Sequence, residues 1–249
     1  MIYGQRAAIA LGRGSLHDAQ VDAETGLLLV EDRHFANLQL LAVAISVHVE
    51  RGDVGAADEL AQRREALGVA EDRAYLEDFL VARRRLRIAQ GRIEEGVADL
   101  TWCGERLERP RSAGAELLAG VRGPALASLG ETATAAALAQ EQLGLARAAG
   151  ATGAVGRSLR ATALVARDDR RIAVLEEAVS VLEQSADRLE LAHALCDLGA
   201  ALSRGRQRRQ ARGVQRRAME LAGACGAIAL AERARAEVQA GPGVARGSS

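Results

Sequence analysis

The chain repeats a structural pattern about every 39 residues, and this period constrains its fold more than any other feature of the sequence. A short turn recurs between helical patterns, and the first residues of successive turns lie 40, 39, 39, 37 and 38 positions apart. Gly opens all but one of these turns, and it is the residue that most readily takes the left-handed conformation that ends a helix. The six turns are Gly12-Arg13-Gly14, Gly52-Asp53-Val54, Gly91-Arg92-Ile93, Gly130-Glu131-Thr132, Arg167-Asp168-Asp169 and Gly205-Arg206-Gln207.

The apolar residues between the turns follow helical spacing. Leu40, Ala44 and Val47 share one face of a helix before the second turn, and similar sets flank the other turns. No run alternates between apolar and polar residues as a strand would. Asp53 and Thr132 stand where a side chain caps the following helix. Two helices of about 15 residues with two short loops make a unit of the observed length, which is an antiparallel helical hairpin.

One hairpin cannot bury its own apolar face, whereas a stack of hairpins buries a continuous core. The sequence therefore predicts an all-α fold, a right-handed superhelix (α-solenoid) of about six antiparallel helix pairs over residues 1–240. A further helix over about 227–239 is expected to cap the C-terminal end. Residues 241–249, which are rich in Gly and Ser, are expected to form a disordered tail.

Two segments disturb the period. The polar connection at 108–112 predicts a hinge between an N-terminal and a C-terminal half, although one continuous superhelix is the preferred interpretation. Gly123-Pro124 falls inside an expected helix, where proline removes a backbone hydrogen bond and kinks or splits the helix.

Composition favours helices and argues against several classes of function. Aromatic residues make up only 2% of the chain, and Ala, Leu and Val supply most of the apolar content. All 33 basic residues are Arg and 33 acidic residues balance them, so the whole chain lacks the net charge of a nucleic-acid or anionic-membrane binder. Cys103, Cys196 and Cys225 have the spacing of neither a disulfide framework nor a zinc site. Together with the lack of a long apolar stretch, they predict a soluble, cytoplasmic protein with buried thiols and no membrane contact.

The last full unit has the relative spacing of the tetratricopeptide repeat consensus, at Leu195, Leu198, Gly199, Leu202, Ala211 and Ala218. Leucines replace the large aromatic residues of that family and the period is longer than its roughly 34 residues, so the unit resembles a degenerate, elongated relative. From about Leu143 to Val238 the chain also resembles the helical-repeat region of the large ATP-binding transcription regulators of the LuxR type, common in actinobacteria. The segments with this resemblance are LGLARAAGATGAVGRSLRATALV, LEEAVSVLEQSADRLELAHALCDLGAAL and RRAMELAGACGAIALAERARAEV.

The LuxR-type resemblance implies a sensory repeat region that acts together with an ATPase domain and a helix-turn-helix domain. This sequence contains neither of those domains, and the phosphate loop GxxxxGK[ST] is absent since the chain has no Lys. The resemblance therefore implies either a piece of a larger regulator or a free-standing relative. Nucleic acid would be bound only through the absent domains.

In stacked hairpins the first helix of each unit lines the inner, concave face of the superhelix, where a partner or ligand binds. On the register set by the turns, this face is predicted to include five charged or titratable residues. They are His48, Glu77, Arg84, Arg87 and His193.

A second candidate site is the run from Arg204 to Arg217, which contains seven arginines. Arg204, Arg208, Arg212 and Arg216 are the residues that would contact phosphate groups. No aromatic side chain lies nearby to stack on bases, and a solvated outer helix face accounts for the run without any ligand. Nucleic-acid binding through this patch is thus the least favoured interpretation.

Catalytic and metal sites find little support. His193 and Cys196 lie three residues apart, but no third ligand or orienting carboxylate accompanies them. Adjacent carboxylates such as Glu94 and Glu95 point about 100° apart on a helix and do not face each other. No catalytic residue, metal or cofactor is therefore predicted.

The sequence predicts a non-enzymatic regulatory or sensor module that binds a protein partner, a peptide or a small-molecule inducer on its concave face. Self-association into a homo-oligomer is also open. The alternative is a free-standing peptide-binding or protein-binding scaffold unrelated to transcription.

Overall fold

The computed structural model describes residues 2–30, 36–66, 76–96, 98, 132–166 and 168–240. These residues form eleven labelled α-helices and no strand, which confirms the predicted all-α fold. The helices are α1 (Ile2–Gly12), α2 (Leu16–Leu29), α3 (Ala36–Arg51), α4 (Val54–Ala66), α5 (Leu76–Ala89), α8 (Thr132–Ala149), α9 (Thr152–Val165), α10 (Asp168–Leu182), α11 (Arg188–Arg204), α12 (Arg208–Cys225) and α13 (Ile228–Ala240). The predicted hinge at 108–112, Gly123-Pro124, Cys103 and the tail at 241–249 lie outside the described residues.

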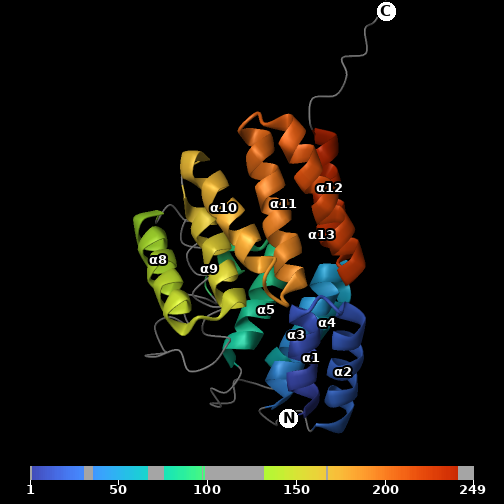
Figure 1. Ribbon diagram of the computed structural model, residues 1–249. Coiled ribbons are helices and arrows are strands. Elements are labelled where there is room, and N and C mark those ends of the chain that lie inside the picture. The colour runs from blue at the N-terminus through green and yellow to red at the C-terminus, as the bar shows by residue number, and fades with distance from the viewer. Residues whose placement is uncertain are drawn as a thin grey trace, which may run out of the picture.

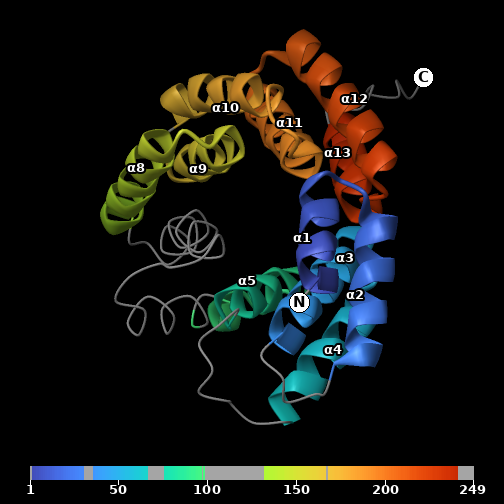
Figure 2. The ribbon, with the colours of Figure 1, turned by 60° about the horizontal axis from the view of Figure 1, so that its bottom comes forward.

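Neighbouring helices pack as antiparallel pairs in a curved stack, as expected for a solenoid (Figure 1). Seen along the curve, the stack forms an open ring, with α9 and α11 toward its inner side and α10 and α12 toward its outer side (Figure 2). This is the arrangement predicted for the first and second helices of each hairpin. None of the helices within the described ranges is long and apolar enough to cross a membrane.

The apolar stripe of α11 shows how the consensus spacing produces packing. Leu195, Leu198 and Leu202 are buried in the largest core cluster together with residues of α10, α12 and α13. Gly199 is the point where α11 approaches α12, since a Cβ at Gly199 would lie only 2.5 Å from Cγ of Gln215. A small residue is therefore required at this consensus position, because a larger one would push the two helices apart.

The turns that begin at Gly12, Gly52, Gly91 and Gly205 follow helices as predicted, but the residue that reverses the chain is not always the expected one. Gly130, Glu131 and Arg167 of the other two predicted turns lie outside the described residues. Asp53 accepts a hydrogen bond from the backbone N–H of Ala56 at 3.1 Å, which confirms its predicted role as a helix cap. At the sixth turn the left-handed residue is Arg206, with φ 61°, whereas Gly205 has φ −72°, so Gly205 is not the residue that reverses the chain there. The turns between hairpins, at Gly150 and Gly226, also use left-handed glycines, and the sequence did not single these out.

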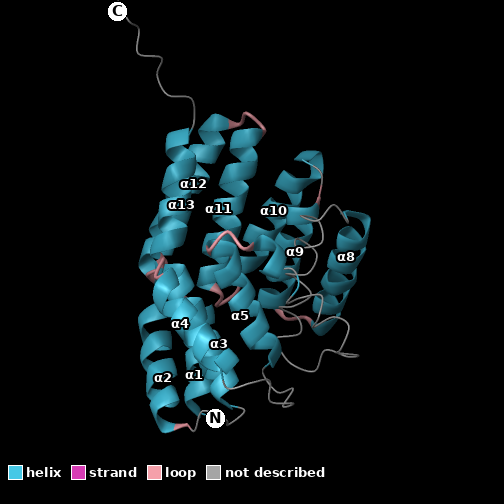
Figure 3. Cartoon of the chain, turned by 180° about the vertical axis from the view of Figure 1, so that it is seen from behind, coloured by secondary structure: helices cyan, strands magenta, loops and turns pink. Residues whose placement is uncertain are grey.

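The N-terminal and C-terminal units pack directly on each other, which the sequence did not predict. The last helix, α13, contacts α3 in addition to α11 and α12, and α1 touches α11. Figures 1 and 3, drawn from opposite sides, both place α13 beside the α1–α4 hairpins. Leu16 of the first hairpin shares a core cluster with Ala218 and Leu230. The first hairpins thus pack on the last unit, so that the two ends of the stack lie against each other.

Candidate binding site on the inner side of the ring

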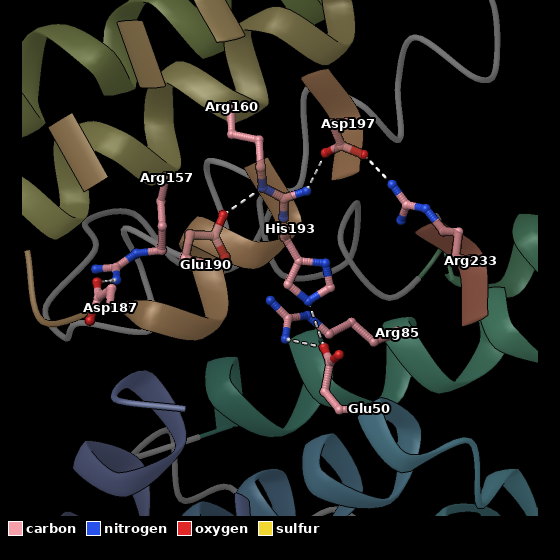
Figure 4. Close-up of polar contacts among 9 residues, drawn as sticks. All are labelled: Glu50, Arg85, Arg157, Arg160, Asp187, Glu190, His193, Asp197 and Arg233. Carbon is pink, nitrogen blue, oxygen red and sulfur yellow. Dashed lines mark hydrogen bonds and ion pairs between the residues drawn. The ribbon is translucent and has the colours of Figure 1, made fainter. Parts of the chain in front are cut away.

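Charged side chains from five helices converge where the two ends of the stack meet (Figure 4). They belong to α3, α5, α9, α11 and α13, and α11 supplies three of them. We call this group the inner charged cluster, which consists of Glu50, Arg85, Arg160, Glu190, His193, Asp197 and Arg233.

One half of the cluster is organised around Arg160 of α9. Its Nε donates to Oε1 of Glu190 at 2.6 Å and its Nη1 donates to Oδ2 of Asp197 at 2.8 Å. The other oxygen of Asp197 accepts a hydrogen bond from Arg233 of α13. One guanidinium and two carboxylates, all largely buried, therefore join α9 to α11, and Arg233 extends the network to α13.

Electrostatics keep this half of the cluster ionised. Burial raises the pKa of Glu190, but attraction to Arg160 and, more weakly, to His193 outweighs it and lowers the pKa to about 2. Burial likewise opposes ionisation of Asp197, yet Arg160 and Arg233 hold its pKa below the usual range. For Arg160, burial alone would lower the pKa, and the two carboxylates raise it above its ordinary value.

The other half joins the N-terminal hairpins to the last unit. Nε2 of His193 lies 2.9 Å from Oε1 of Glu50, and Nη1 of Arg85 lies 3.8 Å from the same oxygen. Glu50 is on α3, so this contact connects residues 143 positions apart in the chain. Burial raises the pKa of Glu50, whereas His193 and then Arg85 lower it, to about 2.

Replacing Glu50 with Gln is expected to lower the free energy of unfolding at pH 7 by about 2 kcal/mol, because it leaves His193 and Arg85 without their carboxylate. The folded pKa of about 2 lies below the ordinary 4.5, so the stabilisation is complete above pH 4.5 and is lost as the pH falls toward 2. The free energies of unfolding of the two proteins, measured with denaturant at each pH, should converge as the pH falls from 4.5 toward 2. A difference between them that does not depend on pH would contradict the assignment.

The five residues predicted for the concave face have different surroundings. His193 belongs to the inner charged cluster, and Arg84 is the chain neighbour of Arg85 on α5. Glu77 is buried in the first turn of α5. Arg87 donates to the backbone carbonyl of Glu95 at 3.0 Å, and Nδ1 of His48 lies 3.5 Å from Oδ2 of Asp53. His48 and Arg87 thus hold the turns after their own helices.

Sequence reasoning missed most of the cluster, although α11 offered a signal. Glu190, His193 and Asp197 are spaced by three and four residues, which places them on one side of a helix whose remaining residues are mostly apolar. A stripe of charged residues on an otherwise buried helix indicates that side chains of opposite charge lie against it. Their partners Glu50, Arg160 and Arg233 had no comparable signal, since they come from distant units.

The side chains of His193 and Cys196 have separate surroundings. His193 is bound to Glu50, and Cys196 is buried, which raises the pKa of its thiol. Cys225 is likewise a buried free thiol. No group of three potential metal ligands occurs in the part of the chain that the structure describes.

Two other surface features are distinct from the cluster. The side chains of the arginine patch, Arg204, Arg208, Arg212 and Arg216, are exposed near and along α12. A shallow pocket between α1 and α2 is lined by residues that include Arg6 and Asp22, whose charges pair at 3.0 Å. Neither feature includes a residue predicted for the concave face.

Comparison with known proteins shows the fold but not a family. No protein-family model matches the chain, and no curated protein is detectably similar in sequence. A Rap protein solved in complex with competence and sporulation factor superposes with a TM-score of 0.68 at 11% identity, over 95% of this chain and 69% of that one. BtubC from P. vanneervenii gives 0.52 at 17% identity over 97% of both chains. The chain also superposes on 41% of a signal transduction ATPase with a tetratricopeptide repeat sensor from Pyrococcus horikoshii, with 95% of this chain covered, a TM-score of 0.53 and 11% identity. These neighbours show that the fold is a tetratricopeptide-like helical repeat.

Proposed function

We propose that this chain is a non-enzymatic regulatory module that binds a peptide or protein segment on the inner side of its ring of helices. The observation that supports this most directly is the inner charged cluster, because five helices direct charged groups to one place on that side. The Rap neighbour was solved with competence and sporulation factor, and another neighbour has its repeats as a sensor. Binding by the same kind of scaffold is consistent with both.

A ligand at the cluster would affect how the two ends of the stack pack together. The contact between Glu50 and His193 joins α3 to α11, and Arg160 joins α9 to α11. A ligand that bonds to these groups more strongly in one arrangement of the hairpins than in another would favour that arrangement. Binding would in this way be transmitted to an attached domain or partner.

The finer version of the proposal is that the chain is the sensory repeat region of a LuxR-type transcription regulator, as the segments from Leu143 to Val238 suggest. In that case the ligand is an inducer. The alternative is a free-standing scaffold that captures a peptide with no part in transcription. Both versions place the ligand on the inner side of the ring.

The test is selection of binding peptides from a random phage-displayed library, followed by affinity measurement with each synthesised peptide. Affinity is compared among the wild type, Arg85→Gln, His193→Gln and the outer-face control Arg212→Gln. We expect a loss of about tenfold or more in the two inner variants, since each removes a charged or hydrogen-bonding group, and no change in the control. The proposal is wrong if no peptide is selected, or if the inner variants bind as well as the wild type.

Nucleic-acid binding through the exposed arginines has a separate signature. The side chains of Arg208, Arg212 and Arg216 are exposed at intervals of four residues along α12. Phosphate contacts would make the affinity for a DNA oligonucleotide fall steeply with salt, and replacing these three arginines with Gln would reduce that slope. If the affinity for DNA is weak and does not change when the three arginines are replaced, nucleic-acid binding through this patch is excluded.

A further inference from the structure

Arg84 of α5 is a partly buried cation that has no counter-charge among the described residues. Its Nε is buried and has no hydrogen-bond partner in the part of the chain that the structure describes. Arg85, the next residue, pairs with Glu50, and Arg160 pairs with two carboxylates, whereas the same described residues supply Arg84 with no ion pair. Unpaired buried polar groups are rare in native proteins and need an explanation.

The charges nearest to Arg84 oppose it. Burial lowers the pKa of Arg84 most strongly, and Arg85 and Arg160 lower it further, to about 9. Arg84 and Arg85 are on α5 and Arg160 is on α9, so cations from separate helices approach one another here. The guanidinium remains charged at neutral pH, and the chain tolerates the cost of burying it next to two like charges.

The three carboxylates of the inner charged cluster are already engaged. Glu190 and Asp197 both accept hydrogen bonds from Arg160, and Glu50 is shared between His193 and Arg85. The inner charged cluster together with Arg84 thus contains four arginines against three carboxylates. Among the described residues the cluster therefore has one arginine more than it has carboxylates, and Arg84 is the arginine without an ion pair.

The backbone also makes room for the stem of Arg84. Gly96 is buried beside it, and a Cβ at Gly96 would lie 3.3 Å from Cγ of Arg84 and 3.5 Å from its carbonyl oxygen. The segment after α5 therefore packs closely against this side chain and limits the directions in which it can extend. An immobilised guanidinium loses less conformational entropy when it binds a ligand than a free one does.

We infer that Arg84, flanked by Arg85 and Arg160, forms a binding point for an oxoanion on the inner side of the ring. A guanidinium binds the paired oxygens of a carboxylate or phosphate through parallel hydrogen bonds, and burial strengthens such contacts. The oxoanion would pair with the arginine that the carboxylates of the cluster leave without a partner. This inference deepens the proposed function, because it names the group by which a peptide ligand would be recognised, and it applies equally to a small free anion.

The test is thermal unfolding with inorganic phosphate or citrate at constant ionic strength, for the wild type, Arg84→Met and the outer-face control Arg212→Met. We expect each anion to raise the Tm of the wild type and of the control by about 4 °C, and to leave that of Arg84→Met unchanged. Without anion, Arg84→Met should unfold at a higher temperature than the wild type, because it removes an unpaired buried charge. That result also shows that the variant folds. The inference is overturned if Arg84→Met responds to anions as the wild type does, or if the control loses the response as well.

A second arm distinguishes the source of the anion and separates this inference from the proposed function. Peptides selected on the wild type are resynthesised with a C-terminal amide and with each Asp or Glu changed to Asn or Gln. A loss of about tenfold in affinity, absent in Arg84→Met, supports a peptide carboxylate. Anion-dependent stabilisation with no such loss supports a free anion. If peptides bind with no dependence on Arg84 and phosphate has no effect, the oxoanion site is wrong and the proposed function is untouched.

Discussion

Replacing Arg160 with Met should lower the free energy of unfolding at pH 7 by about 3–5 kcal/mol, because it leaves two buried carboxylates without their cation. Arg160 donates to both Glu190 and Asp197, and all three side chains are at most 18% exposed. Glu190 has its pKa lowered to about 2 mainly by Arg160, so without this partner burial dominates and the carboxylate is expensive to keep ionised. Arg233 still compensates Asp197 in part.

The measurement is equilibrium denaturant unfolding, with Arg147→Met as the matched control. Arg147 pairs with Glu177 at 2.7 Å, a distance like those in the cluster, but both side chains are about half exposed. A solvent-exposed ion pair is worth about 0–1 kcal/mol, so the control should lose no more than that. Equal losses in the two variants would mean that the inner cluster is no more buried or better paired than the surface. The Arg160→Met loss should also shrink toward pH 2, where Glu190 takes up its proton in the folded wild type.

The sequence predicted the helices because the information that specifies them is local. Spacings of three and four among residues such as Leu195, Leu198 and Leu202 are set within one helix, and Asp53 caps α4 from three residues away. The period of the turns then predicted the hairpins and their stacking. Even the misplaced detail at the sixth turn is local, since Arg206 takes the left-handed conformation one residue after the expected Gly205.

The candidate site could not be predicted because its partners are far apart in sequence. Arg160 lies 30 and 37 residues from its two carboxylates, and Glu50 lies 143 residues from His193. The period places residues within a unit, but it does not specify that the first hairpins pack on the last unit. Without that contact, Glu50 and Arg85 have no reason to be near α11. The register of their own helices predicted His193 and Arg84 for the concave face, but it gave no indication of which charged groups would meet them.

The packing of the two ends on each other is tested by replacing Gly14 with Ala, which should lower the free energy of unfolding by about 2–5 kcal/mol. Two effects add. Gly14 has φ 78°, a conformation that costs an L-residue about 1–2 kcal/mol. A Cβ there would also overlap Sγ of Cys225 at the end of α12, and forcing extra atoms into a packed interior costs about 1–3 kcal/mol.

Gly91→Ala separates the two effects. Gly91 has the same φ of 78°, and no other atom of the described residues lies within 4 Å of where its Cβ would be. This control should therefore lose only the conformational part, about 1–2 kcal/mol. The excess loss in Gly14→Ala should fall when Cys225 is also changed to Ala, because the smaller side chain leaves space for the new methyl group. If the double variant regains part of the free energy of unfolding that Gly14→Ala loses, Gly14 and Cys225 are in contact in solution. If the losses of the two single variants simply add, the first turn and α12 are not packed together.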